Sequence, residues 1–192
     1  MQYEKEITVE VSCSLEEFKE ILLKNNFQTI DEYDVNDIYM IDKRNMYHKD
    51  KLELLKHCIL LRNIVTSDKE RNIITYKYKE YDENKNILNQ GKIDCEITSI
   101  NEAKELFQAI NYQELIRIND HITVYVNDED EIALEVVGNH IYLEIEENCN
   151  RINKKYGSVN EMKEVISKYN IPIKDNNYFV KKAEVALNEK NI

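Results

Sequence analysis

The stretch Glu4-Lys5-Glu6-Ile7-Thr8-Val9-Glu10-Val11 places Ile7, Val9 and Val11 on one side of an extended chain and Glu4, Glu6, Thr8 and Glu10 on the other. Successive side chains of a β-strand point to opposite faces, so the stretch predicts a strand with one apolar and one acidic face. The same alternation recurs in later extended segments. Their ionisable positions are Arg62, Lys77, Lys79, Lys92, Asp94, Glu96, Arg117, His121, Glu135, Glu144 and Glu146.

Pattern and turn signals predict about eight strands with few helices between them. The extended segments are residues 4–11, 28–39, 58–65, 73–81, 92–98, 115–126, 131–137 and 141–146. Ser14 with Glu17, and Ser99 with Glu102, form capping boxes that open two helices; a third helix spans about 159–169 and a last one starts near Asn177. Residues 43–57 fit either a short helix or a surface excursion. Regular β, α alternation is missing, so we expect an antiparallel sheet.

Two parts of the chain look like weak copies of one strand–helix–strand unit. Asn111-Tyr112-Gln113 follows the second capped helix as Asn26-Phe27-Gln28 follows the first. A strand with an acidic face precedes each helix. The echo predicts a pseudo-twofold fold.

The charged strand faces have two readings. In an ordinary antiparallel sheet they face water. If the sheet closes, they line a shared polar lumen while the apolar faces meet helices outside. We expect the second: an α+β fold consisting of a closed antiparallel eight-stranded β-barrel, a tunnel, with helices packed on the outside.

Composition bounds the class of protein. The chain has 192 residues, 42% of them hydrophobic and 33% charged, with a net charge of −11. This predicts one domain over residues 1–192 and argues against binding to nucleic acid or an anionic membrane. The absence of a CxxC pair, of a signal segment and of a long apolar run predicts free thiols and a cytoplasmic protein.

The mixture of charges suggests a chemistry. Arg and Lys side chains suit phosphate oxygens, and paired carboxylates suit hard cations such as Mg²⁺ or Mn²⁺. Together they favour metal-assisted phosphoryl or nucleotidyl transfer, in which positioning and electrostatics supply most of the rate. No Ser/His/Asp or Cys/His pattern indicates a covalent nucleophile.

Six short motifs lie in the predicted strands: Glu4 to Glu10, Asp37-Ile38-Tyr39-Met40-Ile41-Asp42, Leu61-Arg62, Thr75-Tyr76-Lys77, Lys92-Ile93-Asp94-Cys95-Glu96 and Leu143-Glu144-Ile145-Glu146. Together they resemble the ExExK, DxYxxxD-like, LRxR, TyK, basic-then-acidic and EIE strands of the CYTH family. These are the triphosphate tunnel metalloenzymes, which include class IV adenylate cyclases, thiamine triphosphatases and inorganic triphosphatases. The resemblance spans nearly the whole chain and leaves a homodimer open.

The resemblance implies roles for named residues. The catalytic positions are Arg62, Lys77 and Arg117; the substrate-binding positions are Arg62, Lys77, Lys79, Lys92, Arg117 and Tyr39; the metal ligands are Glu4, Glu6, Glu135, Glu144 and Glu146. The sequence departs from the family motifs at three places, and each departure removes a basic residue. The ExExK lysine falls on Thr8 or Glu10, depending on register, Ile64 replaces the second arginine of LRxR, and the usual later basic pair is reduced to Arg117 with Asn119.

We therefore expect a metal-dependent hydrolase of a small organic or inorganic triphosphate, with Mg²⁺ or Mn²⁺ as cofactor. The alternatives are a class IV-type adenylate cyclase, which converts ATP to cyclic AMP and pyrophosphate, a non-catalytic nucleotide or polyphosphate-binding protein, and an acidic interaction domain with no such ligand. The motifs do not identify the substrate, because its contacts come from loops and lumen shape.

Overall fold

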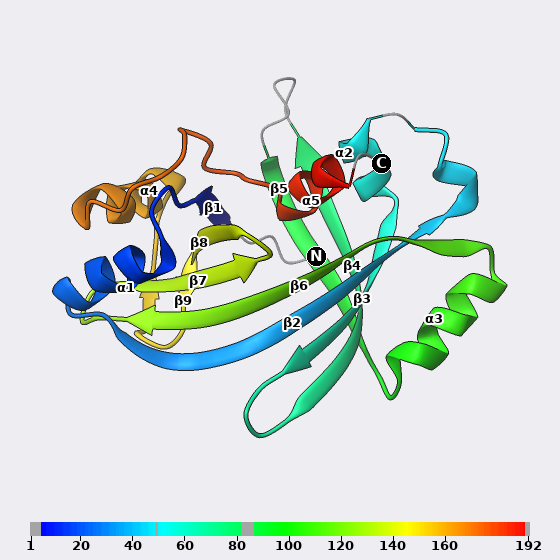
Figure 1. Cartoon of the computed structure of the whole chain (residues 1–192), viewed down its shortest axis with the longest axis horizontal. Coiled ribbons are helices and arrows are strands. Elements are labelled where there is room, and N and C mark those ends of the chain that lie inside the picture. Colours follow the sequence, from blue (N-terminus) through cyan, green and yellow to red (C-terminus); the bar gives the residue numbers. More distant parts are fainter. Residues whose placement is uncertain (1–4, 49, 82–86, 191–192) are drawn as a thin grey trace. The chain divides into compact units, whose positions relative to one another are not determined.

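The computed structural model describes residues 5–48, 50–81 and 87–190, apart from the side chains of 79–81 and 87–90 (Figure 1). The strands are β1 (Glu6–Glu10), β2 (Gln28–Asp42), β3 (Cys58–Val65), β4 (Glu70–Tyr81), β5 (Ile87–Ile97), β6 (Tyr112–Val126), β7 (Glu131–Val137), β8 (His140–Glu146), β9 (Asn148–Cys149) and β10 (Lys154–Lys155). The helices are α1 (Leu15–Lys24), α2 (Lys51–Lys56), α3 (Ile100–Ala109), α4 (Val159–Lys168) and α5 (Lys182–Glu189), with a 3₁₀ turn at Lys43–Asn45.

Eight strands form one sheet in the order β1-β8-β7-β6-β2-β3-β4-β5. The α+β class and the large antiparallel sheet are confirmed. The predicted closed barrel is wrong, because the sheet is open: β1 and β5 are its two edges, and no ladder joins them within the described residues.

The backbone bonding of β1 explains why the sheet does not close there. The N–H of Thr8 donates to Tyr178 O and the N–H of Val180 donates to Thr8 O, both at 3.0 Å. Lys174 N–H donates to Glu10 O at 2.8 Å. These bonds use the outer edge of β1 that a closing strand would need. The last helix was therefore placed too early: residues 172–180 run beside β1, and α5 begins only at Lys182.

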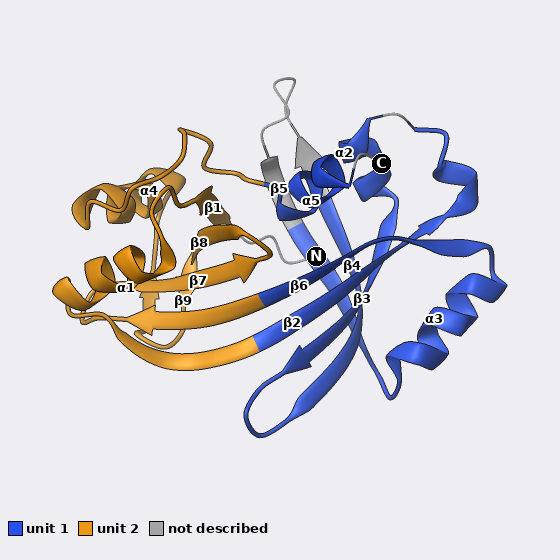
Figure 2. Cartoon of the chain, viewed as in Figure 1, with its two compact units in different colours: residues 1–3, 34–120, 181–192 blue, residues 4–33, 121–180 orange. Residues whose placement is uncertain are grey.

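The chain forms two compact units, coloured in Figure 2. Unit 1 comprises residues 1–3, 34–120 and 181–192, and unit 2 comprises residues 4–33 and 121–180. The long strands β2 and β6 each contribute residues to both units.

Each unit packs helices on the apolar face of its strands, as the alternation predicts. In unit 2, Ile7 and Leu143 pack with Phe18 of α1 and Met162 of α4, and all four are fully buried. In unit 1, the core joins strand residues to Ala103 and Phe107 of α3; the strand residues are Ile38, Met40 and Leu61. The ionisable positions of these strands thereby fall on the opposite face of the sheet.

The two strand–helix–strand units are confirmed as β1-α1-β2 and β5-α3-β6. Asn26 and Asn111, which follow the two helices, have φ values of 60° and 74°. A left-handed residue at this position ends a helix, and Asn tolerates it better than most residues. The sequence echo therefore marks two equivalent helix ends.

All four cysteines are free, in agreement with the sequence analysis. Among the described residues, no helix combines the length and apolarity that a membrane crossing would need.

Candidate functional site

The charged face of unit 1 lies opposite α3 and is built by cross-strand pairs. Asp37 of β2 lies opposite Arg62 of β3, and Lys77 of β4 lies opposite Lys92 of β5. Residues directly opposite in an antiparallel ladder share a face, with their Cβ atoms about 5 Å apart. The fold thus brings three of the predicted phosphate-binding residues onto one face.

Arg62 is held by an internal carboxylate. Its Nε donates to Asp37 Oδ1 at 2.7 Å and its Nη2 donates to Asp37 Oδ2 at 2.6 Å. Burial acts to lower the pKa of Arg62, but the two hydrogen bonds to Asp37 raise it above its ordinary value. The guanidinium is fully charged, yet Asp37 neutralises it. Sequence spacing could not reveal this pair, because the two residues lie on different strands.

Tyr39 and a second ion pair share this part of unit 1. Burial raises the pKa of Tyr39, and the carboxylate of Asp37 raises it further, whereas Arg62 and Lys182 act in the opposite direction. Lys182, the first residue of α5, donates to Asp120 Oδ2 at 2.9 Å. Neither Asp120 nor Lys182 was a predicted site residue, and no motif indicated them.

Lys77 and Lys92 lie directly opposite each other in the ladder of β4 and β5, on one face of the sheet. Lys77 is partly buried and Lys92 is exposed. Lysine side chains that share a strand face suit the oxygens of an anion such as phosphate. Lys79 lies in β4, but its side chain falls outside the described residues.

Arg117 lies on the other side of its strand from Asp120. It alternates with the buried residues Ile116, Ile118 and Asp120. Its Nη2 donates to Glu114 Oε2 at 3.2 Å, and the same oxygen accepts from Lys104 of α3 at 2.7 Å. The described contacts therefore place Arg117 near α3 rather than with Arg62.

The charged face of unit 2 is dominated by carboxylates. Glu6 of β1 lies opposite Glu146 of β8, and Thr8 lies opposite Glu144. The hydroxyl of Thr8 donates to Glu144 Oε2 at 3.3 Å. Glu135, on the same face of β7, is only 3% exposed. The pKa of Tyr33 is raised to about 12, first by burial and then by the nearby charge of Glu144. The effect of Glu144 reflects the negative potential of this face.

Glu10 has a histidine and a lysine as partners that are distant in sequence. Its Oε1 lies 2.8 Å from His140 Nδ1 and accepts from Lys174 at 3.0 Å. Burial acts to raise the pKa of Glu10, but His140 and Lys174 hold it below its ordinary value. Where one register of the ExExK motif puts a lysine, this chain thus has a glutamate with two basic neighbours.

The carboxylates of unit 2 have the donor chemistry that Mg²⁺ and Mn²⁺ prefer. However, among the described residues no three His, Cys, Asp or Glu side chains are arranged to hold a metal ion. The predicted ligand Glu4 lies outside the described residues. Glu6, Glu135, Glu144 and Glu146 share a face without forming a complete ligand set.

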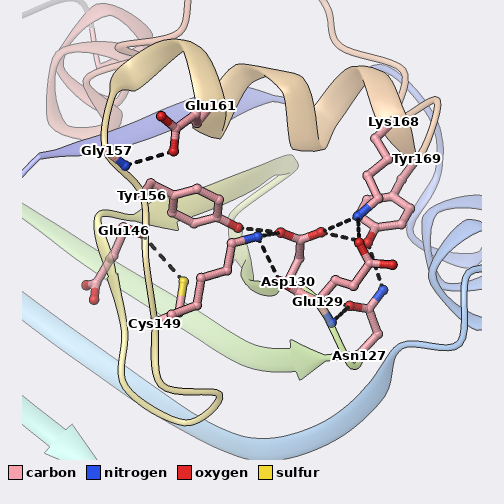
Figure 3. A network of polar contacts seen from close by, with 11 residues as sticks. Asn127, Glu129, Asp130, Glu146, Cys149, Tyr156, Gly157, Glu161, Lys168 and Tyr169 are labelled. Carbon is pink, nitrogen blue, oxygen red and sulfur yellow. Dashed lines mark hydrogen bonds and ion pairs between the residues drawn. The ribbon is translucent and has the colours of Figure 1, made fainter.

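A second polar cluster in unit 2 is centred on Asp130, shown in Figure 3. Oδ1 accepts from Tyr156 at 2.7 Å and from Lys154 at 2.5 Å. Oδ2 accepts from Tyr169 at 2.7 Å and from Lys168 at 2.9 Å. Both oxygens are satisfied and the residue is 1% exposed, so this cluster has a structural role. No motif in the sequence indicates this cluster.

No family model and no curated protein matches the chain by sequence. Solved structures do match it. The PH1819 protein from Pyrococcus horikoshii OT3 has a TM-score of 0.68 and 18% identity, covering 96% of this chain and 99% of that one. A candidate adenylyl cyclase from Hippeastrum with a dominant triphosphatase activity has a TM-score of 0.61 and 11% identity, covering 98% and 96%. A candidate adenylate cyclase from Vibrio parahaemolyticus has a TM-score of 0.59 and 11% identity, covering 96% and 98%.

These likenesses concern the fold. They confirm, at that level, the resemblance to the CYTH family that the strand motifs predicted. A fold can carry different activities, so the function must be argued from the charged faces.

Proposed function

We propose that this protein binds a small triphosphate compound and hydrolyses it with the help of Mg²⁺ or Mn²⁺. The observation that carries the proposal is the pairing of Lys77 with Lys92 on the charged face of unit 1. A phosphate group accepts hydrogen bonds from several donors at once, so two lysines on one strand face suit it. The triphosphatase activity named for the Hippeastrum structure supports the same reaction class.

Arg62 has a conditional role in this proposal. To bind a phosphate oxygen, its guanidinium uses N–H groups that Asp37 does not occupy, since Asp37 takes one from Nε and one from Nη2. A guanidinium has five such donors. Asp37 therefore fixes the orientation of Arg62 and reduces its net attraction for an anion.

The carboxylates of unit 2 are the proposed metal ligands, with Glu144 and Glu146 contributed by β8 and Glu6 by β1. Thr8 orients the Glu144 carboxylate by its hydrogen bond. Each unit can be tested by its own substitution.

Titration of tripolyphosphate with and without Mn²⁺ tests the proposal. Arg62→Ala should weaken binding under both conditions, because it removes a phosphate contact. Glu146→Gln should weaken only the Mn²⁺-dependent part, because it removes a metal ligand. Equal small effects of the two substitutions would contradict the assignment.

Matched controls lie away from both charged faces. Arg44→Ala removes an arginine that is 80% exposed beside Asp42, and Glu20→Gln alters a glutamate that is 69% exposed on α1. Both variants should bind tripolyphosphate as the unmodified protein does. If Arg44→Ala weakened binding as much as Arg62→Ala, or Glu20→Gln as much as Glu146→Gln, the overall charge of the protein rather than a site would be responsible.

Two alternatives follow from specific observations. Candidate adenylate cyclases among the similar structures favour a cyclase, which would release pyrophosphate and cyclic AMP from ATP. The neutralisation of Arg62 by Asp37 favours a protein that binds a triphosphate without turnover. Assays of phosphate, pyrophosphate and cyclic AMP with ATP, thiamine triphosphate and tripolyphosphate separate the three outcomes.

A further inference from the structure

Asp120 has a carboxylate oxygen without a hydrogen-bond partner. The residue is 7% exposed, and its Oδ2 accepts from Lys182 at 2.9 Å. Its Oδ1 is the one buried side-chain polar atom without a partner among the described residues. A buried acceptor left unpaired costs about 1–3 kcal/mol, so such an atom requires an explanation.

The surroundings of Asp120 distinguish it from a phosphate site. Ile116 and Ile118 lie on the same side of β6 and are 1% and 6% exposed. Lys182, which holds the other oxygen, also acts on Tyr39, as Arg62 does. Asp120 therefore has apolar neighbours along its own strand, and its partner Lys182 lies close enough to Tyr39 to affect its pKa.

A carboxylate oxygen repels the oxygens of a phosphate chain, and it requires an N–H or O–H donor. Resting on the proposed function, we propose that Asp120 Oδ1 accepts a hydrogen bond from the organic part of the substrate. The substrate class is then an organic triphosphate with a hydroxyl or amino donor, such as a nucleoside triphosphate, rather than inorganic tripolyphosphate. Sites that leave a buried polar group unpaired discriminate strongly against ligands that lack the matching group.

Helix α5 supplies Lys182, the hydrogen-bond partner of the other Asp120 oxygen. It has eight residues and no side-chain hydrogen bond at its N-cap, and Leu187 is its one buried residue within the described part. Short helices without caps depend on tertiary contacts. Those contacts include the hydrogen bonds from Lys182 to Asp120 and from Lys51 to Leu187 O.

Asp120→Asn tests the inference sharply. Lys182 has no acceptor atom, so the amide oxygen must face it and the amide NH₂ must take the place of Oδ1. The substitution thereby turns the unpaired acceptor into a donor without changing the size of the side chain. Affinities for ATP and for tripolyphosphate, measured by calorimetry at the same Mg²⁺ concentration, should respond differently.

We expect Asp120→Asn to weaken ATP binding by about tenfold, the effect of losing one hydrogen bond to a charged acceptor. Tripolyphosphate should bind equally well or more tightly, because one negative charge is removed. Asp68→Asn makes the same change in charge at an exposed turn residue and should leave the ratio of the two affinities unchanged. A thermal unfolding curve establishes that each variant is folded.

An unchanged ratio of affinities in folded Asp120→Asn would overturn the inference and leave the proposed function intact; the oxygen would then have only a water partner. The same change of ratio in Asp68→Asn would also overturn it. If the unmodified protein bound neither compound, the proposed function itself would fail. A second test needs no substitution: the affinity of the unmodified protein is measured for analogues of ATP that each lack one hydroxyl or amino donor. One analogue should lose as much affinity as ATP loses in Asp120→Asn.

Discussion

Two buried aspartates, Asp130 in unit 2 and Asp120 in unit 1, have opposite surroundings. Asp130 receives hydrogen bonds from two tyrosines and two lysines, which satisfy both of its oxygens. Asp120 receives one from Lys182, and its other oxygen is unpaired. A fully satisfied carboxylate stabilises the fold, whereas an incompletely satisfied one is available to a ligand. Burial alone does not separate these roles; the number of donors does.

The largest expected effect is the loss of stability in Asp130→Ala. The substitution removes the buried carboxylate that accepts four hydrogen bonds, and it leaves the hydroxyls of Tyr156 and Tyr169 without this acceptor. A buried polar group without its partner costs about 1–3 kcal/mol. The free energy of unfolding in urea measures the effect. Asp31→Ala, which removes a carboxylate that is 41% exposed and paired with Arg151, is the control and should cost less. Equal losses would show that Asp130 has no special structural role.

Acid should remove the contribution of Asp130 in a predictable direction. Burial acts to raise its pKa, but the hydrogen bonds from Lys154, Lys168 and the two tyrosines hold the pKa well below its usual range. A lowered pKa in the folded state means stability that is complete above the unfolded pKa, about 4. That stability is lost as the pH falls towards the folded pKa.

Asp130→Asn removes the titrating carboxylate and so isolates its pH-dependent contribution to stability. The difference in unfolding free energy between the unmodified protein and Asp130→Asn should therefore be largest near pH 6 and shrink below about pH 4. Urea unfolding at a series of pH values measures it. A difference that stays constant from pH 6 to pH 2.5 would mean that Asp130 does not titrate with folding.

The smallest expected effect is on the stability of Asp120→Asn. Because Oδ1 is already unpaired, we expect the unfolding free energy to change by less than about 1 kcal/mol. Asp130→Asn is the matched comparison, since the same chemical change there disturbs a fully bonded carboxylate. If the two asparagine variants lost equal stability, the contrast between the two aspartates would be wrong.

On the charged faces of the two units, too, the role of a charged residue depends on its partners. Alternation along single strands indicates most of the residues that oppose the helices, because it depends only on the two-residue period of a strand. It places Arg117 wrongly with Arg62, since Arg117 and Lys104 of α3 both bond Glu114. Asp37 neutralising Arg62, and His140 with Lys174 balancing Glu10, were not predictable. These partners lie 25, 130 and 164 residues apart in the chain, so no local spacing relates them.

By itself, the sequence determined the strands, the capped helices, the two equivalent helix ends and the separation of charged from apolar faces. These features follow from local backbone preference and side-chain period. The tertiary structure alone decided that the sheet is open, because residues 172–180 bond to the edge of β1. It also decided which charges are neutralised and which oxygen of Asp120 is unpaired, because the partners of a buried group are set by the elements that pack around it.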